Sequence, residues 1–257
     1  MRQHLFLFRE LVKRDFVSRY AGSLFGLLWS FAQPLWMLLL FGFVFGAVLR
    51  VPLTGERTQS FGVFVFCALL PWTAIHEGLL RSATAVTDNA SLVKKLRFPS
   101  QILVLTVVTT ALIHQAIGLA LFMVFLLLRG ELCGSCLPLL LLAVPLQVAL
   151  TTGLGLLLAT LQVFFRDAVQ VLGLLLSGWF YLTPIVYPLH LVPDGLRPWV
   201  EWNPMSVLVE LYRRALLGPA LVGVPVTLPV LLVTASAVLA VGSWLFSRLS
   251  SGFADEV

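Results

Sequence analysis

Long uncharged stretches separate short charged ones along almost the whole chain. These stretches cover residues 20–49, 58–76, 98–128, 132–165, 168–193 and 215–247. A helix needs about 20 apolar residues to cross a hydrocarbon core of about 30 Å, and each stretch reaches or nearly reaches that length. The pattern therefore predicts six transmembrane helices, with cores at residues 24–47, 59–80, 103–127, 138–161, 169–187 and 227–246.

The first 20 residues have a different pattern, in which charged positions interleave with apolar ones. Their apolar positions recur at intervals of three and four residues: Leu5, Phe8, Leu11, Val12 and Phe16. Their charged positions fall on the other side of a helix: Arg9, Glu10, Lys13 and Arg14. This spacing predicts an amphipathic helix that lies in the cytoplasmic interface. The alternative is a charged start to the first span.

The segment 188–225, before the last predicted span, is long for a loop and rich in apolar residues. Asn203 followed by Pro204 is typical of a helix start, and Leu217-Gly218-Pro219 is typical of a helix end. The helix between them, 205–216, is too short to cross a bilayer, and Glu210 is spaced to pair with Arg213 or Arg214. We expect a re-entrant or interfacial hairpin here, with an ordinary surface-loop helix as the alternative.

The composition agrees with a membrane protein. Hydrophobic residues make up 59% of the 257 residues and charged residues 11%, whereas a soluble domain has roughly 25% charged residues. We therefore expect an all-α polytopic membrane protein with a single transmembrane domain, 1–257. Its parts are an interfacial helix at 1–20, spans one to five at 24–187, an extracytoplasmic re-entrant segment at 188–225 and span six at 227–246.

The formal net charge is +5, and the basic residues flank the apolar stretches. With six spans and both termini cytoplasmic, eleven basic residues lie inside and six outside, which favours this orientation. The basic residues are then topology signals and contacts with membrane lipids, so nucleic acid is not expected as a partner.

Motifs for catalysis are missing from this chain. None of Lys13, Lys94 and Lys95 follows a glycine, so the phosphate-binding loop of an ATPase is missing, and the predicted spans hold essentially no carboxylates. We therefore expect no catalytic residue and no ion-coupled transport, and any energy for transport must come from another subunit.

The cysteines and histidines do not predict a metal site. Cys67 lies in an apolar run, and the four histidines are too scattered to complete a zinc site with Cys133 and Cys136. Those two cysteines form a C-x-x-C pair, which allows a loop disulfide. Two unlinked loop cysteines are the outcome we expect.

The predicted cytoplasmic loop 88–100 has the pattern of a short helix. Asp88 is placed to cap it and Pro99 to end it, with Leu92, Val93 and Leu96 on one side. Such an apolar knob suits a docking element for a partner, although a solvated basic loop is the plainer interpretation of this segment alone.

Aromatic residues within the predicted spans suggest where a sugar polymer would pass. They are Trp36, Trp179, Phe180, Tyr181 and Tyr187. Sugar rings bind on aromatic faces, but aromatic residues in the middle of a membrane are usually packing or lipid-facing residues. If the fifth span continued to 187, Phe180, Pro184 and Tyr187 would share one side, and Pro184 would free the carbonyl of residue 180.

Seven motifs in order make the chain resemble the permease of polysaccharide-exporting ATP-binding-cassette transporters, the O-antigen and teichoic acid exporter family. They are Arg14-Asp15 with residues 19–29 and Gln33-Pro34; Leu69-Leu70-Pro71-Trp72; Asn89, Leu92, Lys94-Lys95 and Phe98-Pro99; Phe165-Arg166-Asp167; residues 183–188; Trp202-Asn203-Pro204; and residues 213–218. The resemblance covers nearly the whole chain.

The resemblance implies a homodimer of permeases paired with two separate ATPase subunits, which bind the ATP and Mg²⁺, so this chain itself needs no cofactor. It implies that Asn89, Leu92, Lys94, Lys95, Leu96 and Phe98 couple to the ATPase. The implied activity is export of a lipid-linked polysaccharide across the cytoplasmic (inner) membrane. O-antigen is the first choice of polymer, with teichoic acid or capsular polysaccharide as alternatives. A drug exporter with a related permease, or an enzyme or ion-coupled transporter embedded in the membrane, is a competing class.

Overall fold

A computed structural model describes residues 2–18, 29–50, 52–95, 98–219 and 228–256. All regular secondary structure in these ranges is helical, which confirms the all-α class. Parts of several predicted elements, such as residues 24–28 of the first span, residues 19–20 of the interfacial helix and 220–225 of the outer segment, lie outside the described residues.

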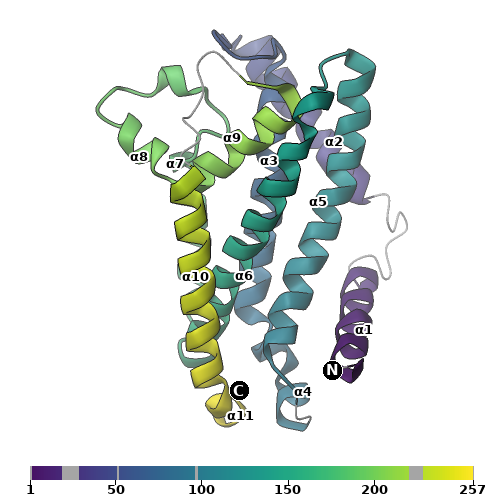
Figure 1. Ribbon diagram of the computed structural model, residues 1–257, viewed down its shortest axis with the longest axis vertical. Helices are drawn as coiled ribbons and strands as arrows, with labels where there is room; N and C mark the ends of the chain where they lie inside the picture. The colour runs from purple at the N-terminus through teal and green to yellow at the C-terminus, as the bar shows by residue number, and fades with distance from the viewer. Residues whose placement is uncertain (1, 19–28, 51, 96–97, 220–227, 257) are drawn as a thin grey trace.

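Four long helices form the body of the molecule: α3 (Phe61–Thr84), α5 (Gln101–Arg129), α6 (Leu140–Phe164) and α10 (Leu228–Leu249). They run side by side along the long axis (Figure 1). Each is long and apolar enough to cross a membrane. The chain is therefore a multi-pass membrane protein, and the four match the predicted second, third, fourth and sixth spans.

The other two predicted spans are shorter. The first is represented by α2 (Trp29–Phe41), which continues as a π-helical stretch, Gly42–Val48. The fifth is α7 (Ala168–Leu182), which ends five residues before the predicted end at 187. Pro184 explains the difference, because the residue before a proline is driven out of the helical region, and Thr183 is extended with φ −103° and ψ 134°.

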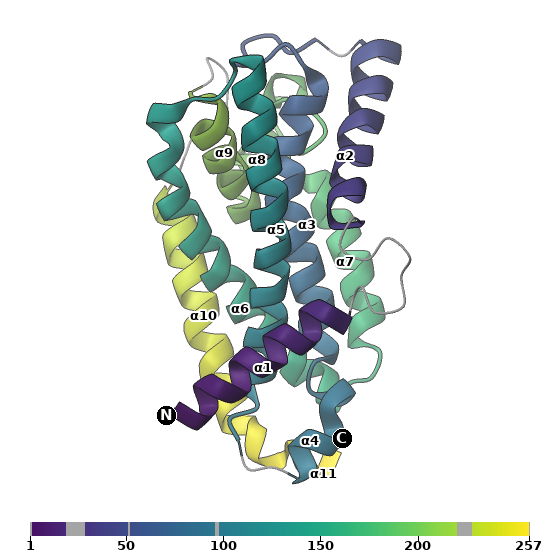
Figure 2. The ribbon, with the colours of Figure 1, turned by 90° about the vertical axis from the view of Figure 1, so that its right-hand side faces the viewer.

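The N-terminal helix α1 (Arg2–Ser18) is amphipathic, as predicted. It lies obliquely across α5 near one end of the bundle (Figure 2). Leu11 is buried and Phe8, Val12 and Phe16 are half-buried, whereas the charged positions named above for the opposite side are mostly exposed. Leu5 departs from the pattern, because 52% of it is exposed.

The outer segment folds onto the bundle through α8 (Arg197–Glu201) and α9 (Pro204–Leu217). The predicted boundaries of α9 are confirmed: the Asn203 side chain accepts a hydrogen bond from the Met205 amide, and Gly218 ends the helix with φ 87°. Residues 205–213 are all buried, so the alternative of a surface-loop helix is wrong. The ion pair of Glu210 with Arg214 spans 2.9 Å.

Two glycines allow α6 and α10 to approach closely. A Cβ atom added to Gly242 would collide with the carbonyl oxygen of Gly153, and one added to Gly153 would lie 2.5 Å from the amide nitrogen of Leu239. Small residues that let two backbones meet are typical of helix pairs in membranes, where the apolar lipid leaves packing to hold helices together.

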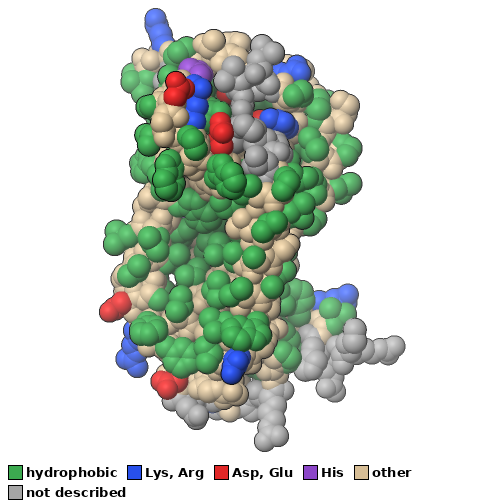
Figure 3. Space-filling model, turned by 60° about the vertical axis from the view of Figure 1, so that its left-hand side comes forward, with side chains coloured by type: hydrophobic (Ala, Val, Ile, Leu, Met, Phe, Trp, Pro, Cys, Tyr) green, Lys and Arg blue, Asp and Glu red, His purple; other side chains and the backbone are tan. Residues whose placement is uncertain are grey.

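Charged side chains gather toward the two ends of the molecule on the face in Figure 3, and a hydrophobic belt lies between them. Many large apolar side chains are exposed, including Leu174 and Leu175 on α7 and Val233 on α10. Lipid is the solvent in which such exposure costs nothing.

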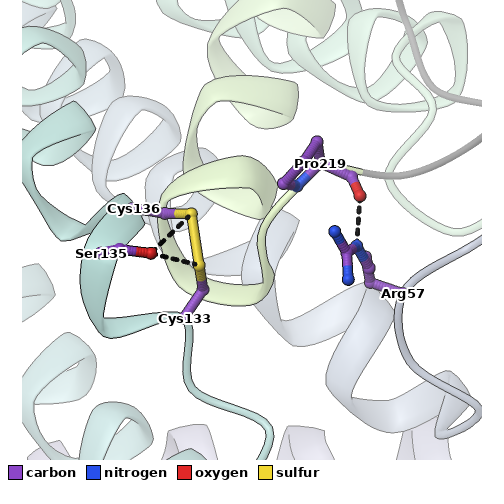
Figure 4. Close-up of a disulfide and its surroundings, with 5 residues drawn as sticks. All are labelled: Arg57, Cys133, Ser135, Cys136 and Pro219. Atoms are coloured by element: carbon purple, nitrogen blue, oxygen red, sulfur yellow. Dashed lines mark hydrogen bonds between the residues drawn. A yellow bond between two sulfur atoms is a disulfide. The ribbon is translucent and has the colours of Figure 1, made fainter.

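The loop after α5 carries a disulfide between Cys133 and Cys136, so the expectation of two unlinked cysteines is wrong (Figure 4). The Cys133 amide donates a hydrogen bond of 2.8 Å to the carbonyl of Leu216 on α9. Nearby, Arg57 donates a hydrogen bond to the carbonyl of Pro219. The disulfide loop and the loop before α3 therefore both hold the end of α9.

The short helices α4 (Ala90–Lys95) and α11 (Phe253–Glu256) lie together at the opposite end of the bundle. The N-terminal turn of α1 also lies toward that end (Figures 1 and 2). Asp88 does not cap α4, because it lies inside a 3₁₀ turn, Thr87–Asn89, that precedes α4 and has Val86 at its N-cap position.

Candidate functional site

Asn203 joins the end of α7 to the start of α9. Its side-chain oxygen accepts a hydrogen bond of 2.9 Å from the indole nitrogen of Trp179, in addition to the bond from Met205 that caps α9. Its amide nitrogen donates to the hydroxyl of Thr183 over 3.0 Å. One amide therefore fixes the loop that leaves α7, the cap of α9 and the orientation of one of the predicted glycan-path aromatics.

Trp179 and Phe180 are half-buried, and both pack against a tryptophan of another helix. Trp72 on α3 contacts the edge of Trp179 at a centroid distance of 5.9 Å and contacts Phe180 at 5.5 Å. Both side chains lie against the main core cluster. Their contacts are those of packing residues, the alternative considered for these aromatics.

Tyr181 and Trp36 are exposed, whereas Tyr187 is half-buried like Trp179 and Phe180. Tyr181 is 69% exposed, and its carbonyl accepts a 2.8 Å hydrogen bond from the Tyr187 hydroxyl. Trp36 on α2 is 65% exposed. The structure thus gathers four of the five predicted aromatics around the end of α7 and places Trp36 on a separate helix.

The predicted role of Pro184 is wrong in two respects. Because α7 ends at Leu182, Phe180 and Tyr187 do not lie on one side of a common helix. The carbonyl of Phe180 is not freed either, because it accepts a 3.3 Å hydrogen bond from the Thr183 amide.

Arg213, one of the basic residues of the predicted segment 188–225, is a buried cation. It is 6% exposed, and its guanidinium lies 3.7 Å from the centre of the Phe64 ring. It donates to the carbonyls of Phe64, at 3.4 Å, and Ile185, at 3.1 Å. Arg213 therefore connects α9 to α3 and to the segment after Pro184.

A second polar cluster joins α5, α6 and α9. Gln115 donates to Gln147 over 3.1 Å and to the Tyr212 hydroxyl over 2.9 Å, and Tyr212 donates to Gln147 over 2.6 Å. All three side chains are buried. The sequence contains a signal for this cluster, namely isolated glutamines within apolar spans. Polar side chains in such spans commonly form hydrogen bonds between helices.

The predicted coupling segment packs against the bundle at the end that carries α4 and α11, away from the end of α9. Asn89 donates to the Ala85 carbonyl and accepts from Arg14 of α1 at 3.2 Å. Leu92, with Val93 and Phe98, packs against a cluster that includes Leu11 and Phe253. Lys94 is exposed, Leu96 lies outside the described residues, and so does the side chain of Lys95.

Next to this segment, a charged cluster fixes α1 to the bundle. The Arg81 guanidinium makes a two-pronged ion pair with Asp15, one contact being 3.0 Å. Arg81 also lies 3.7 Å from Glu77, which in turn lies 4.0 Å from His114 on α5. The described residues contain no group of three His, Cys, Asp or Glu placed to hold a metal.

The sequence matches the family model described as ABC-2 type transporter over residues 7–217, which include most of α1, the coupling segment and α9. The chain belongs to the ABC-2 transporter family. Its relatives in this family are permease subunits of ATP-binding-cassette transporters rather than enzymes in themselves.

Several curated relatives are similar along most of their length. The O-antigen export system permease protein RfbA of Myxococcus xanthus is 32% identical over 82% of this chain and 80% of its own. An RfbA of Klebsiella pneumoniae is 28% identical over 95% of this chain and 92% of its own. The polysialic acid transport protein KpsM of Escherichia coli is 26% identical over 80% of each.

Proposed function

We propose that this chain is the membrane subunit of an exporter that moves a lipid-linked polysaccharide, with O-antigen as the first choice, across the cytoplasmic membrane. The observation that carries the proposal is the likeness to O-antigen permeases over 82% to 95% of the chain. The near-absence of carboxylates from the predicted spans also supports it, because ion-coupled transporters commonly need such groups.

The proposed arrangement has six crossings, with both termini in the cytoplasm. In it α2 with its π-helical extension and α7 cross beside the four long helices. The 15 residues of α7 rise only about 22 Å, which is less than the core of about 30 Å. The loop after α7 and the buried helix α9 would then lie within the outer part of the membrane as a re-entrant segment, covered by protein as non-helical backbone there must be.

Transport would be powered by a separate ATPase that binds ATP and Mg²⁺, in a complex of two permeases and two ATPase subunits. The support is the family membership together with the absence of a phosphate-binding loop from the sequence. The ATPase would dock at the end formed by α4 and α11. There Lys94 is exposed, while Leu92 supports the fold of the docking surface from within.

The polymer would contact the exposed aromatic faces of Tyr181 and Trp36 and the half-buried ring of Tyr187. Trp179 and Phe180 would act behind them as packing residues, because Trp72 and Asn203 already engage them. Stacking on an aromatic ring is worth roughly 1–3 kcal/mol for a nucleobase, and a sugar gains less. Several weak contacts would let a polymer slide without being trapped.

Complementation tests the proposal. This chain and its cognate ATPase are expressed in a strain that lacks its own O-antigen permease, and O-antigen is measured at the cell surface and inside the cell. We expect surface O-antigen to return only when both subunits are present. Surface O-antigen that stays absent, with both proteins at normal levels in the membrane, would exclude O-antigen as the substrate.

Capsular polysaccharide is the second candidate, favoured by the 26% identity with the polysialic acid transport protein. The same two subunits are expressed in a strain that lacks its capsule permease. Restored capsule without restored O-antigen would assign the second substrate, and restoration of neither would leave teichoic acid or a drug-like molecule as the class to test.

A further inference from the structure

A groove between α1 and α5 lies outside the glycan path and outside the coupling segment. It encloses about 300 Å³. Phe8, Val12 and Phe16 line it from α1, and Thr109 and Ile113 line it from α5. Its lining is almost entirely apolar, so its ligand must offer an apolar group.

Two cations border this apolar lining. Arg9 and Lys13 complete the groove, and both are exposed. Residues four apart on a helix are neighbours, so the two side chains can reach the same anion. Within the part of the chain that the structure describes, no ion pair engages either of them, and the Asp15 carboxylate of the same helix is paired with Arg81. The groove therefore combines an apolar cleft with a pair of available positive charges.

The depth of the groove suits a lipid. Thr109 and Ile113 follow the start of α5 by eight and twelve residues, which places them about 12–18 Å along the helix axis from its first residue. That start lies beside α4 and α11, at the end of the bundle where α1 begins (Figure 2). With that end in the cytoplasm, the cleft opens toward the hydrocarbon of the cytoplasmic leaflet and the cations lie at its edge.

We propose that this groove binds an anionic phospholipid of the cytoplasmic leaflet, with an acyl chain between α1 and α5 and the phosphate on Arg9 and Lys13. The inference rests on the proposed cytoplasmic position of α1, and it concerns bulk lipid rather than the exported molecule. A bound lipid would fill the cleft under α1 and hold this helix against α5. The protein would then depend on the leaflet's anionic lipid as well as on its own side chains.

The test measures binding of phosphatidylglycerol to the full-length chain by native mass spectrometry in a neutral detergent, with phosphatidylcholine as the zwitterionic comparison. We expect one phosphatidylglycerol to bind more tightly than the rest. The double variant Arg9→Gln/Lys13→Gln should weaken that event by about 30-fold, since each basic residue at a membrane surface accounts for roughly fivefold. The matched control Lys94→Gln/Arg166→Gln removes the same charge from exposed residues elsewhere and should leave the tight event unchanged.

A second pair of variants tests the acyl chain. Thr109→Phe fills the groove while keeping both cations and should abolish the tight event, whereas Leu127→Phe, on the exposed outer part of α5, should not. Melting temperature and gel filtration verify that each variant folds. Equal loss in the two charge variants, equal affinity for phosphatidylcholine, or an unchanged tight event in Thr109→Phe would overturn the proposal. Binding in detergent is independent of export, so it can fail while complementation succeeds.

Discussion

Asn203 shows how much one polar side chain organises in a protein made mostly of apolar residues. It caps α9, bonds the indole of Trp179 and holds the Thr183 hydroxyl at the point where α7 ends. In apolar surroundings each of these groups would otherwise lack a partner, which costs more than the bond itself contributes. The same reasoning applies to the buried Gln115, Gln147 and Tyr212.

Replacement of Asn203 should separate its two roles. Asn203→Ala should lower stability by about 1–3 kcal/mol, because it removes the helix cap and leaves the Trp179 N–H unpaired. Asn203→Ser keeps a capping oxygen and should lose less. Thermal melting of the two purified variants in one detergent measures their loss of stability. Equal losses in Asn203→Ala and Asn203→Ser would show that the helix cap contributes nothing.

Glu56, in the loop before α3, should make stability depend on pH. Burial raises the pKa of its carboxyl from 4.5 to about 7, an effect that Arg213 opposes and Glu210 reinforces. Between these values the folded chain keeps a proton that the unfolded chain has released, so the free energy of unfolding falls as pH rises from about 4.5 through about 7. In Glu56→Gln this part of the dependence should disappear. Melting temperatures across this range test it, and parallel profiles for the two proteins would contradict it.

At the scale of elements, the contact between α6 and α10 leaves very little room for added side-chain atoms. Gly153 and Gly242 bring two backbones together where a side chain has no room. In the part of the chain that the structure describes, no side chain along the middle of α10 bonds to another helix, so this contact explains how α10, much of whose surface is exposed, is held to the bundle. Shape alone fixes this helix pair.

Gly242→Ala should therefore destabilise the protein by about 1–3 kcal/mol, the usual cost of forcing extra atoms into a packed interface. Gly173→Ala is the matched control, because a Cβ atom at Gly173 meets nothing within 4 Å and the change favours a helix by about 1 kcal/mol. The melting temperature and the yield of monodisperse protein should both fall in Gly242→Ala and should both stay the same or rise in Gly173→Ala. A melting temperature of Gly242→Ala at or above that of the original protein would contradict the close approach.

Sequence reasoning predicted the elements that local chemistry determines. The ends of α9 follow from Asn203, Pro204 and Gly218, and the amphipathic face of α1 follows from its spacing. The end of α7 was missed although Pro184 was present, because helix length was judged by apolar content alone. The hydrogen-bond partners of Arg213 and Gln115 could not be predicted from the sequence, because they depend on how helices that are distant in the chain pack together.

The candidate site was predicted only in part. The aromatic positions were found, but composition does not distinguish a ring that packs, such as Trp179, from one that is exposed, such as Tyr181. That distinction depends on Trp72 of α3, about one hundred residues away in the chain. The disulfide was likewise undetermined, because spacing permits the bond without requiring it.

For the whole molecule, the end with α4 and α11 is where we expect the ATPase to bind, and its exposed surface determines what kind of partner surface fits it. The end with α4 and α11 has a short helix whose apolar side is occupied by the protein's own core, so its polar side is what remains for docking. Lys94 lies on that side and is exposed. The expected partner surface is therefore complementary in charge rather than strongly apolar.

Reversing this charge should weaken coupling without unfolding the permease. In Lys94→Glu we expect ATP hydrolysis by the assembled transporter to respond less to the permease and export to fall, while membrane insertion and melting temperature stay as before. Leu92→Asp should lower the melting temperature as well, because Leu92 packs in the core cluster. Wild-type export by Lys94→Glu would remove this residue from the coupling surface.

The disulfide at the end of α9 has a consequence for orientation that is independent of the distribution of basic residues. Disulfides persist in oxidising compartments and are reduced in the cytosol. We therefore expect the end of the bundle that carries the Cys133–Cys136 bond to face the periplasmic or extracellular side. We then expect the opposite end, with α1, α4 and α11, to face the reducing cytosol, where an ATPase would find its ATP. A thiol reagent that cannot cross membranes should accordingly label these two cysteines in intact cells or spheroplasts after mild reduction, and should leave the buried Cys67 unlabelled.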